Sequence, residues 1–96
     1  MHAYLTPQAE ADLEEISDYI ALDNAERAMS FIEEIRGHCE KIANAPLRYV
    51  ARPELGRQLR SCAHGNYVIF FEPFEDGALI LRILQGARNL PGIFGS

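Results

Sequence analysis

The chain has 96 residues, of which 48% are hydrophobic and 24% charged, and its formal net charge is −5. This composition and length predict one globular domain over residues 1–96, and the roughly 20-residue apolar run of a membrane-spanning helix is missing. The first fifteen residues lack the basic start and apolar middle of a signal peptide, so we expect a cytoplasmic protein.

The two cysteines and three histidines form no metal-binding pattern. Cys39 and Cys62 are 23 residues apart, which is outside the close spacing of zinc ligands, and no HExxH motif accompanies them. We therefore expect two reduced, buried thiols and no metal or other cofactor.

Charge is distributed unevenly along the chain. Residues 1–45 carry ten acidic and three basic side chains, whereas residues 46–96 carry four acidic side chains and six arginines, giving net charges of −7 and +2. A protein that binds nucleic acid through its phosphates needs a larger basic excess. The sequence therefore predicts no direct binding to nucleic acid.

The first half of the chain has the periodicity of two helices. Residues 2–5 suit an edge strand, and Thr6-Pro7 then begins a helix whose apolar positions recur at helical spacing. Asp23 is expected to cap a second helix, with Glu26 completing a capping box, and this helix runs to about Ala45. The two amphipathic helices should form an antiparallel hairpin.

The second half changes to strand periodicity. A loop is expected over 46–56, a strand over 57–62, a tight turn over 63–66 and a strand over 67–71. Glu75-Asp76-Gly77 indicates a second hairpin turn, and residues 78–84 form the central, most buried strand. Residues 86–96 read as an irregular tail. The predicted fold class is α+β, with an N-terminal edge strand and a helical hairpin packed on a small antiparallel sheet.

Arg82 is the first candidate for a functional residue, because it interrupts the apolar run Leu79–Leu84. A charged group in such a strand must be paired or must open onto a site. It forms either a structural ion pair with Glu72 or an anion- or partner-binding site together with Arg60. His64 could act as an acid or base, but its position beside Gly65 favours a plain turn residue.

Four segments, in order, carry a resemblance to a known family. They are residues 5–16 (LTPQAEADLEEI), the fragments GR at 56–57 and LRS at 59–61, residues 65–71 (GNYVIFF), and residues 80–89 (ILRILQGARN). The chain resembles the ParE/RelE superfamily, the small toxins of bacterial type II toxin–antitoxin modules, and most closely its ParE branch. The family's fold, a helical hairpin on an antiparallel sheet, agrees with the one expected above.

The resemblance implies one of two activities. RelE-like members are ribosome-dependent mRNA endoribonucleases. ParE-like members are not nucleases; they poison DNA gyrase and so block replication. RelE-type nucleases use lysines and arginines on the sheet and a tyrosine near the C-terminus. Here no lysine follows Lys41, the tail offers only Phe94 as an aromatic, and the pI is near 5.1, which favours the ParE branch. A degenerate toxin fold that acts only as an interaction module is the third hypothesis.

The resemblance also implies partners and site residues. A ParD-like antitoxin would neutralise the toxin through a segment that folds on it, and DNA gyrase would be the target. Three positions depart from the family pattern: Glu72, Gln85 and Asn89 stand where relatives often have arginine, histidine and aspartate. The candidate residues for binding the target or the antitoxin are Arg57, Arg60, Arg82, Arg88, Asn89, Ile93 and Phe94.

Overall fold

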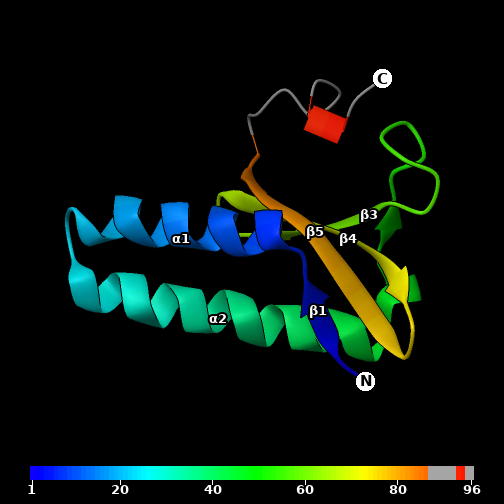
Figure 1. Cartoon of the computed structure of the whole chain (residues 1–96), viewed down its shortest axis with the longest axis horizontal. Helices are drawn as coiled ribbons and strands as arrows, with labels where there is room; N and C mark the ends of the chain where they lie inside the picture. Colours follow the sequence, from blue (N-terminus) through cyan, green and yellow to red (C-terminus); the bar gives the residue numbers. More distant parts are fainter. Residues whose placement is uncertain (87–92, 95–96) are drawn as a thin grey trace.

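The computed structural model describes residues 1–86 and 93–94, and shows two helices on one face of a five-stranded sheet (Figure 1). The strands lie in the order β1-β5-β4-β3-β2, so the expected α+β class is confirmed. No helix in this described part of the chain is long and apolar enough to cross a bilayer. In chain order the elements are β1 (Ala3–Leu5), α1 (Pro7–Ala21), α2 (Ala25–Asn44), a short 3₁₀ helix η1 (Pro46–Arg48), β2 (Val50–Ala51), β3 (Arg60–His64), β4 (Tyr67–Phe74) and β5 (Gly77–Gln85).

The sheet is antiparallel except at one edge. Strands β2 to β5 pair with antiparallel neighbours, whereas β1 runs parallel to β5, with Ala3 opposite Ala78 and Leu5 opposite Ile80. The expected N-terminal edge strand is therefore present, and its three residues cover only the first part of β5. The rest of that edge of β5 faces α1.

The start of α1 agrees with the sequence signal. The Thr6 hydroxyl oxygen accepts a hydrogen bond from the Ala9 backbone N–H at 3.0 Å, and Pro7 occupies the first helical position. The same hydroxyl donates to the carbonyl oxygen of Leu81 on β5 at 2.9 Å. Thr6 therefore caps the helix and joins it to the sheet.

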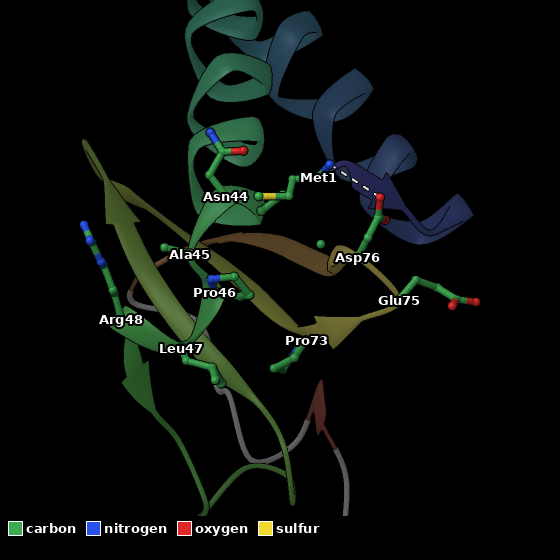
Figure 2. A pocket seen from close by; sticks show the side chains of 11 residues that line it. Met1, Asn44, Ala45, Pro46, Leu47, Arg48, Pro73, Glu75 and Asp76 are labelled. Atoms are coloured by element: carbon green, nitrogen blue, oxygen red, sulfur yellow. Dashed lines mark ion pairs between the residues drawn. The ribbon is translucent and has the colours of Figure 1, made fainter.

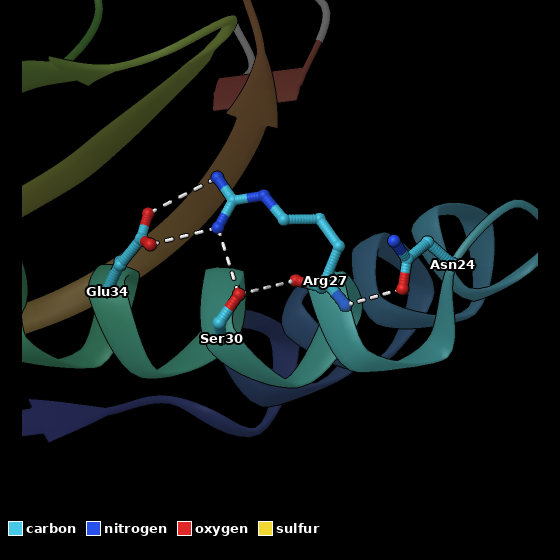
Figure 3. A network of polar contacts seen from close by, with 4 residues as sticks. All are labelled: Asn24, Arg27, Ser30 and Glu34. Atoms are coloured by element: carbon cyan, nitrogen blue, oxygen red, sulfur yellow. Dashed lines mark hydrogen bonds and ion pairs between the residues drawn. The ribbon is translucent and has the colours of Figure 1, made fainter.

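The start of α2 differs from the prediction by one residue. Asn24, not Asp23, is the cap, and its side-chain oxygen accepts from the Arg27 backbone N–H at 3.0 Å (Figure 3). The backbone N–H groups of Asp23 and Asn24 both donate to the Ile20 carbonyl, so Asp23 still belongs to the last turn of α1. The capping box with Glu26 was therefore wrong.

An exposed ion pair follows this cap along α2. The Arg27 guanidinium donates to Glu34 at 2.9 Å and to the Ser30 hydroxyl at 3.0 Å (Figure 3). The hydrogen bond from Arg27 lowers the pKa of Glu34. Both side chains are about half exposed, so solvent screens the pair and it adds little stability.

The predicted strand over 57–62 is shifted in the structure. Arg57 lies in a turn closed by the bond from Leu59 N–H to the Gly56 carbonyl, and β3 begins at Arg60. At its other end β3 continues to His64, which pairs with Tyr67 across a two-residue turn. Gly65 has a φ of 59° in this turn, a value that suits glycine.

Each face of the sheet has its own apolar cluster. The face toward the helices packs Ile69, Phe71, Ile80 and Ile83 against the buried stripes of α1 and α2. The opposite face is covered by the loop before β3 and by the chain's end: Leu55 and Leu59 from the loop, and Ile93 and Phe94 from the tail, pack around Phe70 and Leu84. The sheet is therefore buried on both sides.

Gly77 allows β1 to reach the start of β5. A Cβ at this position would overlap the backbone carbonyl oxygen of His2, and the Ala78 N–H donates to that same oxygen at 3.2 Å. Gly37 on α2 is the opposite case, because a Cβ there would meet no atom within 4 Å. Gly77 is thus a steric requirement of the parallel pairing.

We expect Gly77→Ala to lower the free energy of unfolding by about 2 kcal/mol or more, because β1 must move away from β5. Gly37→Ala is the matched control, and it should stabilise the protein by up to about 1 kcal/mol, since alanine favours helix. Urea denaturation followed by circular dichroism measures both. Equal effects of the two substitutions would contradict the steric role of Gly77.

Candidate partner-binding site

Arg82 on β5 is held by Asp12 on α1. Its Nε and one terminal nitrogen donate to the two Asp12 carboxylate oxygens at 2.8 and 3.0 Å. The two side chains are 24% and 12% exposed, so the pair is mostly shielded from solvent. This bidentate contact raises the pKa of Arg82. Arg82 thus forms a structural ion pair, as one of the two hypotheses held, but the expected partner Glu72 was wrong: Glu72 lies on β4, opposite Leu79 of β5.

The Asp12 carboxylate also binds the backbone of β5. The register between β4 and β5 shifts between Phe70 and Phe71, which is a β-bulge. Beyond the bulge the Ile83 N–H points away from β4 and donates to Asp12 at 2.9 Å. Asp12 therefore satisfies three donors and locks α1 onto the irregular part of the sheet.

Arg60 does not converge with Arg82. Arg60 lies on β3 and Arg82 on β5, with β4 between them. The Arg60 guanidinium donates to the Tyr49 carbonyl oxygen at 2.6 Å, just before β2 at the opposite edge of the sheet from α1. The prediction of one anion-binding arginine pair was therefore wrong: both guanidinium groups are bound by their own chain.

The remaining candidate residues are dispersed. Arg57 is exposed in the loop before β3. Ile93 and Phe94 pack on the far face of the sheet, with the Phe94 ring 4.8 Å from that of Phe70. Arg88 and Asn89 lie outside the described residues. Ile93 and Phe94 thus cover the sheet, while the candidates that the structure describes do not gather in one site.

A groove of about 280 Å³ lies between α1 and the last residues of β5. Asp12 and Glu15 line it from α1, together with Tyr19, which is 71% exposed. Among the described residues no strand pairs with this end of β5 on the side toward α1, because β1 ends opposite Ile80. The groove therefore combines the end of β5, where Asp12 binds the Ile83 N–H, with acidic and aromatic side chains.

A second pocket, of about 490 Å³, lies at the C-terminal end of α2 (Figure 2). Leu47 and Met1 are more than two-thirds exposed there. The N-terminal ammonium lies 3.4 Å from Asp76 and lowers the pKa of that carboxyl group. The pocket is formed by main-chain turns around η1 and carries no cluster of reactive side chains. In residues 1–86 and 93–94 no three His, Cys, Asp or Glu side chains are placed to hold a metal ion.

Asp12 was not predicted as the partner of Arg82. Asp12 lies beside Leu13 and between Ala9 and Ile16, three residues on the buried stripe of α1. A carboxylate on the border of a buried stripe needs a partner for the same reason as an arginine within a strand. The need of both Asp12 and Arg82 for an oppositely charged partner was the sequence signal that could have paired them.

A solved structure resembles this fold. It is described as the chromosomal ParDE toxin–antitoxin system from P. aeruginosa, and its matched chain has a TM-score of 0.74 and 24% sequence identity. The match covers 88% of this chain and 95% of that chain, so nearly the whole architecture is shared. No curated protein sequence matches the chain.

The sequence also matches a family model over residues 3–90, described as the ParE toxin of the type II toxin–antitoxin system parDE. The match spans both helices and all five strands. The chain therefore belongs to the ParE toxin family of type II toxin–antitoxin systems.

We expect Asp12→Ala to lower the free energy of unfolding by about 3 kcal/mol, because it leaves Arg82 and the Ile83 N–H without their acceptor. Arg82→Ala should cost a similar amount, and the double variant should cost less than the sum, since each change removes the same contact. Glu14→Ala, on the exposed face of α1, is the control and should stay within about 0.5 kcal/mol. Chemical denaturation measures all four; additive costs would contradict the coupling.

Proposed function

We propose that this toxin poisons DNA gyrase and thereby blocks replication, as the ParE branch of the superfamily does. The proposal rests on the ion pair that the sheet arginine Arg82 forms with Asp12. A ribosome-dependent nuclease needs cations free to stabilise the charge that develops on the RNA phosphate. The Asp12 carboxylate binds the Arg82 guanidinium through two hydrogen bonds and compensates its charge, so Arg82 is not free for an RNA phosphate. Arg60 is held by one hydrogen bond to the Tyr49 carbonyl oxygen.

The charge of the helical hairpin supports the same proposal. Acidic side chains of α1 and α2 face solvent, among them Glu14, Glu26 and Glu33. Such a surface repels the phosphates of ribosomal RNA rather than attracting them. A protein target such as gyrase places no such demand for positive charge on the toxin.

Supercoiling and cleavage assays with purified gyrase test this function. The toxin should inhibit supercoiling and cause cleaved DNA linked to gyrase to accumulate, whereas mRNA on ribosomes should stay intact. Cut mRNA with fully active gyrase would contradict the proposal and assign the chain to the nuclease branch. No effect in either assay would also contradict it, and would favour a fold that acts only as an interaction module.

A ParD-like antitoxin is the proposed partner, and the groove between α1 and β5 is its proposed binding site. An extended peptide can add through main-chain hydrogen bonds beside the last residues of β5, beyond the Ile83 N–H that Asp12 binds. Glu15 beside this end of β5 favours basic side chains on the peptide, and the Tyr19 and Tyr67 rings offer apolar surface. The antitoxin segment expected here is therefore extended and basic. Gln85, one of the departures from the family pattern, also lines this groove.

We expect Glu15→Lys to weaken binding of the antitoxin encoded beside this toxin by about tenfold, because it reverses the charge at the groove. Glu26→Lys makes the same change at the far end of the hairpin, at the start of α2, and should leave the affinity within about twofold. Titration calorimetry with the purified antitoxin compares the two. Equal losses of affinity would show that only net charge matters and would contradict this site.

A further inference from the structure

Three side chains with reactive or titratable groups meet between α2 and β3, away from the α1–β5 groove. The Nδ1 atoms of His38 and His64 are 2.8 Å apart, and His38 Nε2 lies 3.3 Å from the Cys62 sulfur. Cys62 and His64 are two residues apart on a strand, so both face the helices. His38 therefore stands between a thiol and a second imidazole.

We propose that Cys62 is a modification site that forms a mixed disulfide with small anionic disulfides such as glutathione disulfide, with His38 as the base. A nucleophile within hydrogen-bond reach of a base, which a third group orients, is the arrangement that activates side chains for attack. Cys62, His38 and His64 have these three relations. The inference is independent of the proposed action on gyrase.

The exchange balances without any further reagent. The Cys62 thiol proton passes to His38 Nε2, and its sulfur attacks one sulfur of the disulfide, whose S–S bond breaks. The leaving thiolate keeps the electron pair of that bond and takes the proton from His38. One thiol and one disulfide thus give one mixed disulfide and one thiol. For His38 to accept at Nε2, its proton must reside on Nδ1, which donates to His64.

The surroundings of His38 suit a base at neutral pH. Burial, together with His64 on β3 and Lys41 on α2, lowers the pKa of His38, so its imidazole is uncharged and can accept a proton. Burial also raises the pKa of Cys62, so the thiol form predominates and needs such a base. Glu34 on α2 is the nearby carboxylate, and it is paired with Arg27.

Access and charge favour an anionic reagent. Cys62 lines a surface pocket of about 610 Å³ at the β2–β3 edge, with Tyr49 and Val68 among its apolar walls. Arg48 is exposed on the same pocket, while the second arginine, Arg52, is bound by Glu54 at 2.7 Å. The exposed guanidinium of Arg48 therefore supplies a positive charge for the carboxylates of glutathione.

Cys39 provides an internal comparison. It lies on α2 in the main apolar cluster, is 1% exposed, and its burial raises the pKa of its thiol to about 12. Cys39 does not line the pocket that contains Cys62. A reaction that requires only a thiol should still spare Cys39 as long as the chain is folded.

The test incubates the full chain with glutathione disulfide at pH 7 and follows each cysteine by mass spectrometry of its peptides. Cys62 should react about tenfold faster than Cys39 or more, and His38→Gln should lower the Cys62 rate by about tenfold. This loss should shrink as the pH approaches the pKa of the thiol, because hydroxide then replaces the base. Equal rates at the two cysteines, or a Cys62 rate that His38→Gln leaves unchanged at every pH, would overturn the proposal.

Two controls separate chemistry from unfolding and from charge. If His38→Gln unfolded the chain, the rate of reaction at Cys39 would rise. The pH profile of the wild-type protein would then be the test. A Cys62 rate proportional to the thiolate fraction at every pH would overturn the role of His38. Arg48→Gln should slow the reaction with glutathione disulfide about threefold and leave that with the neutral hydroxyethyl disulfide unchanged. Arg36, which pairs with Glu10 of α1, does not line the Cys62 pocket, so Arg36→Gln should change neither rate. An equal loss with both disulfides would overturn the role of Arg48.

Discussion

The fold depends on one carboxylate at the border between the helices and the sheet. Asp12 receives two hydrogen bonds from Arg82 and a third from the Ile83 backbone, at the point where a bulge disturbs the pairing of β5. Without this acceptor an arginine and a backbone N–H would be left unsatisfied in a half-buried position. The helix α1 can cover the sheet here because it brings the missing acceptor with it.

The same contact explains why the proposed partner site is acidic rather than basic. The sheet arginines are used within the fold, Arg82 toward α1 and Arg60 toward the turn before β2. What α1 presents beside them is its own carboxylates and the exposed ring of Tyr19. A surface of this kind suits the proposed protein partners, because protein segments can offer both basic groups and apolar side chains.

The sequence predicted both helices and the last two strands because their signals are local, but it missed η1 and β2, which lie within the expected loop over 46–56. Thr6-Pro7 starts a helix wherever it stands before an amphipathic run, and the run 78–84 is apolar enough to identify a buried strand. The partner of Arg82 could not be predicted in this way, since 70 residues separate it from Asp12 and a bulge decides which way the Ile83 N–H points. His64 was read as a turn residue for the same reason: its neighbour His38 comes from the other half of the chain.

The parallel pairing of β1 with β5 constrains when the chain can fold. Residues 3–5 pair with residues 78–80, so the first strand made by the ribosome has to wait for the last one. The loop between them must be closed before this edge of the sheet gains any contact. A growing chain therefore cannot hold the native sheet, and a product that stops before β5 lacks the strand that joins β1 and α1 to the rest. Translation through β5 is thus a condition for the native sheet.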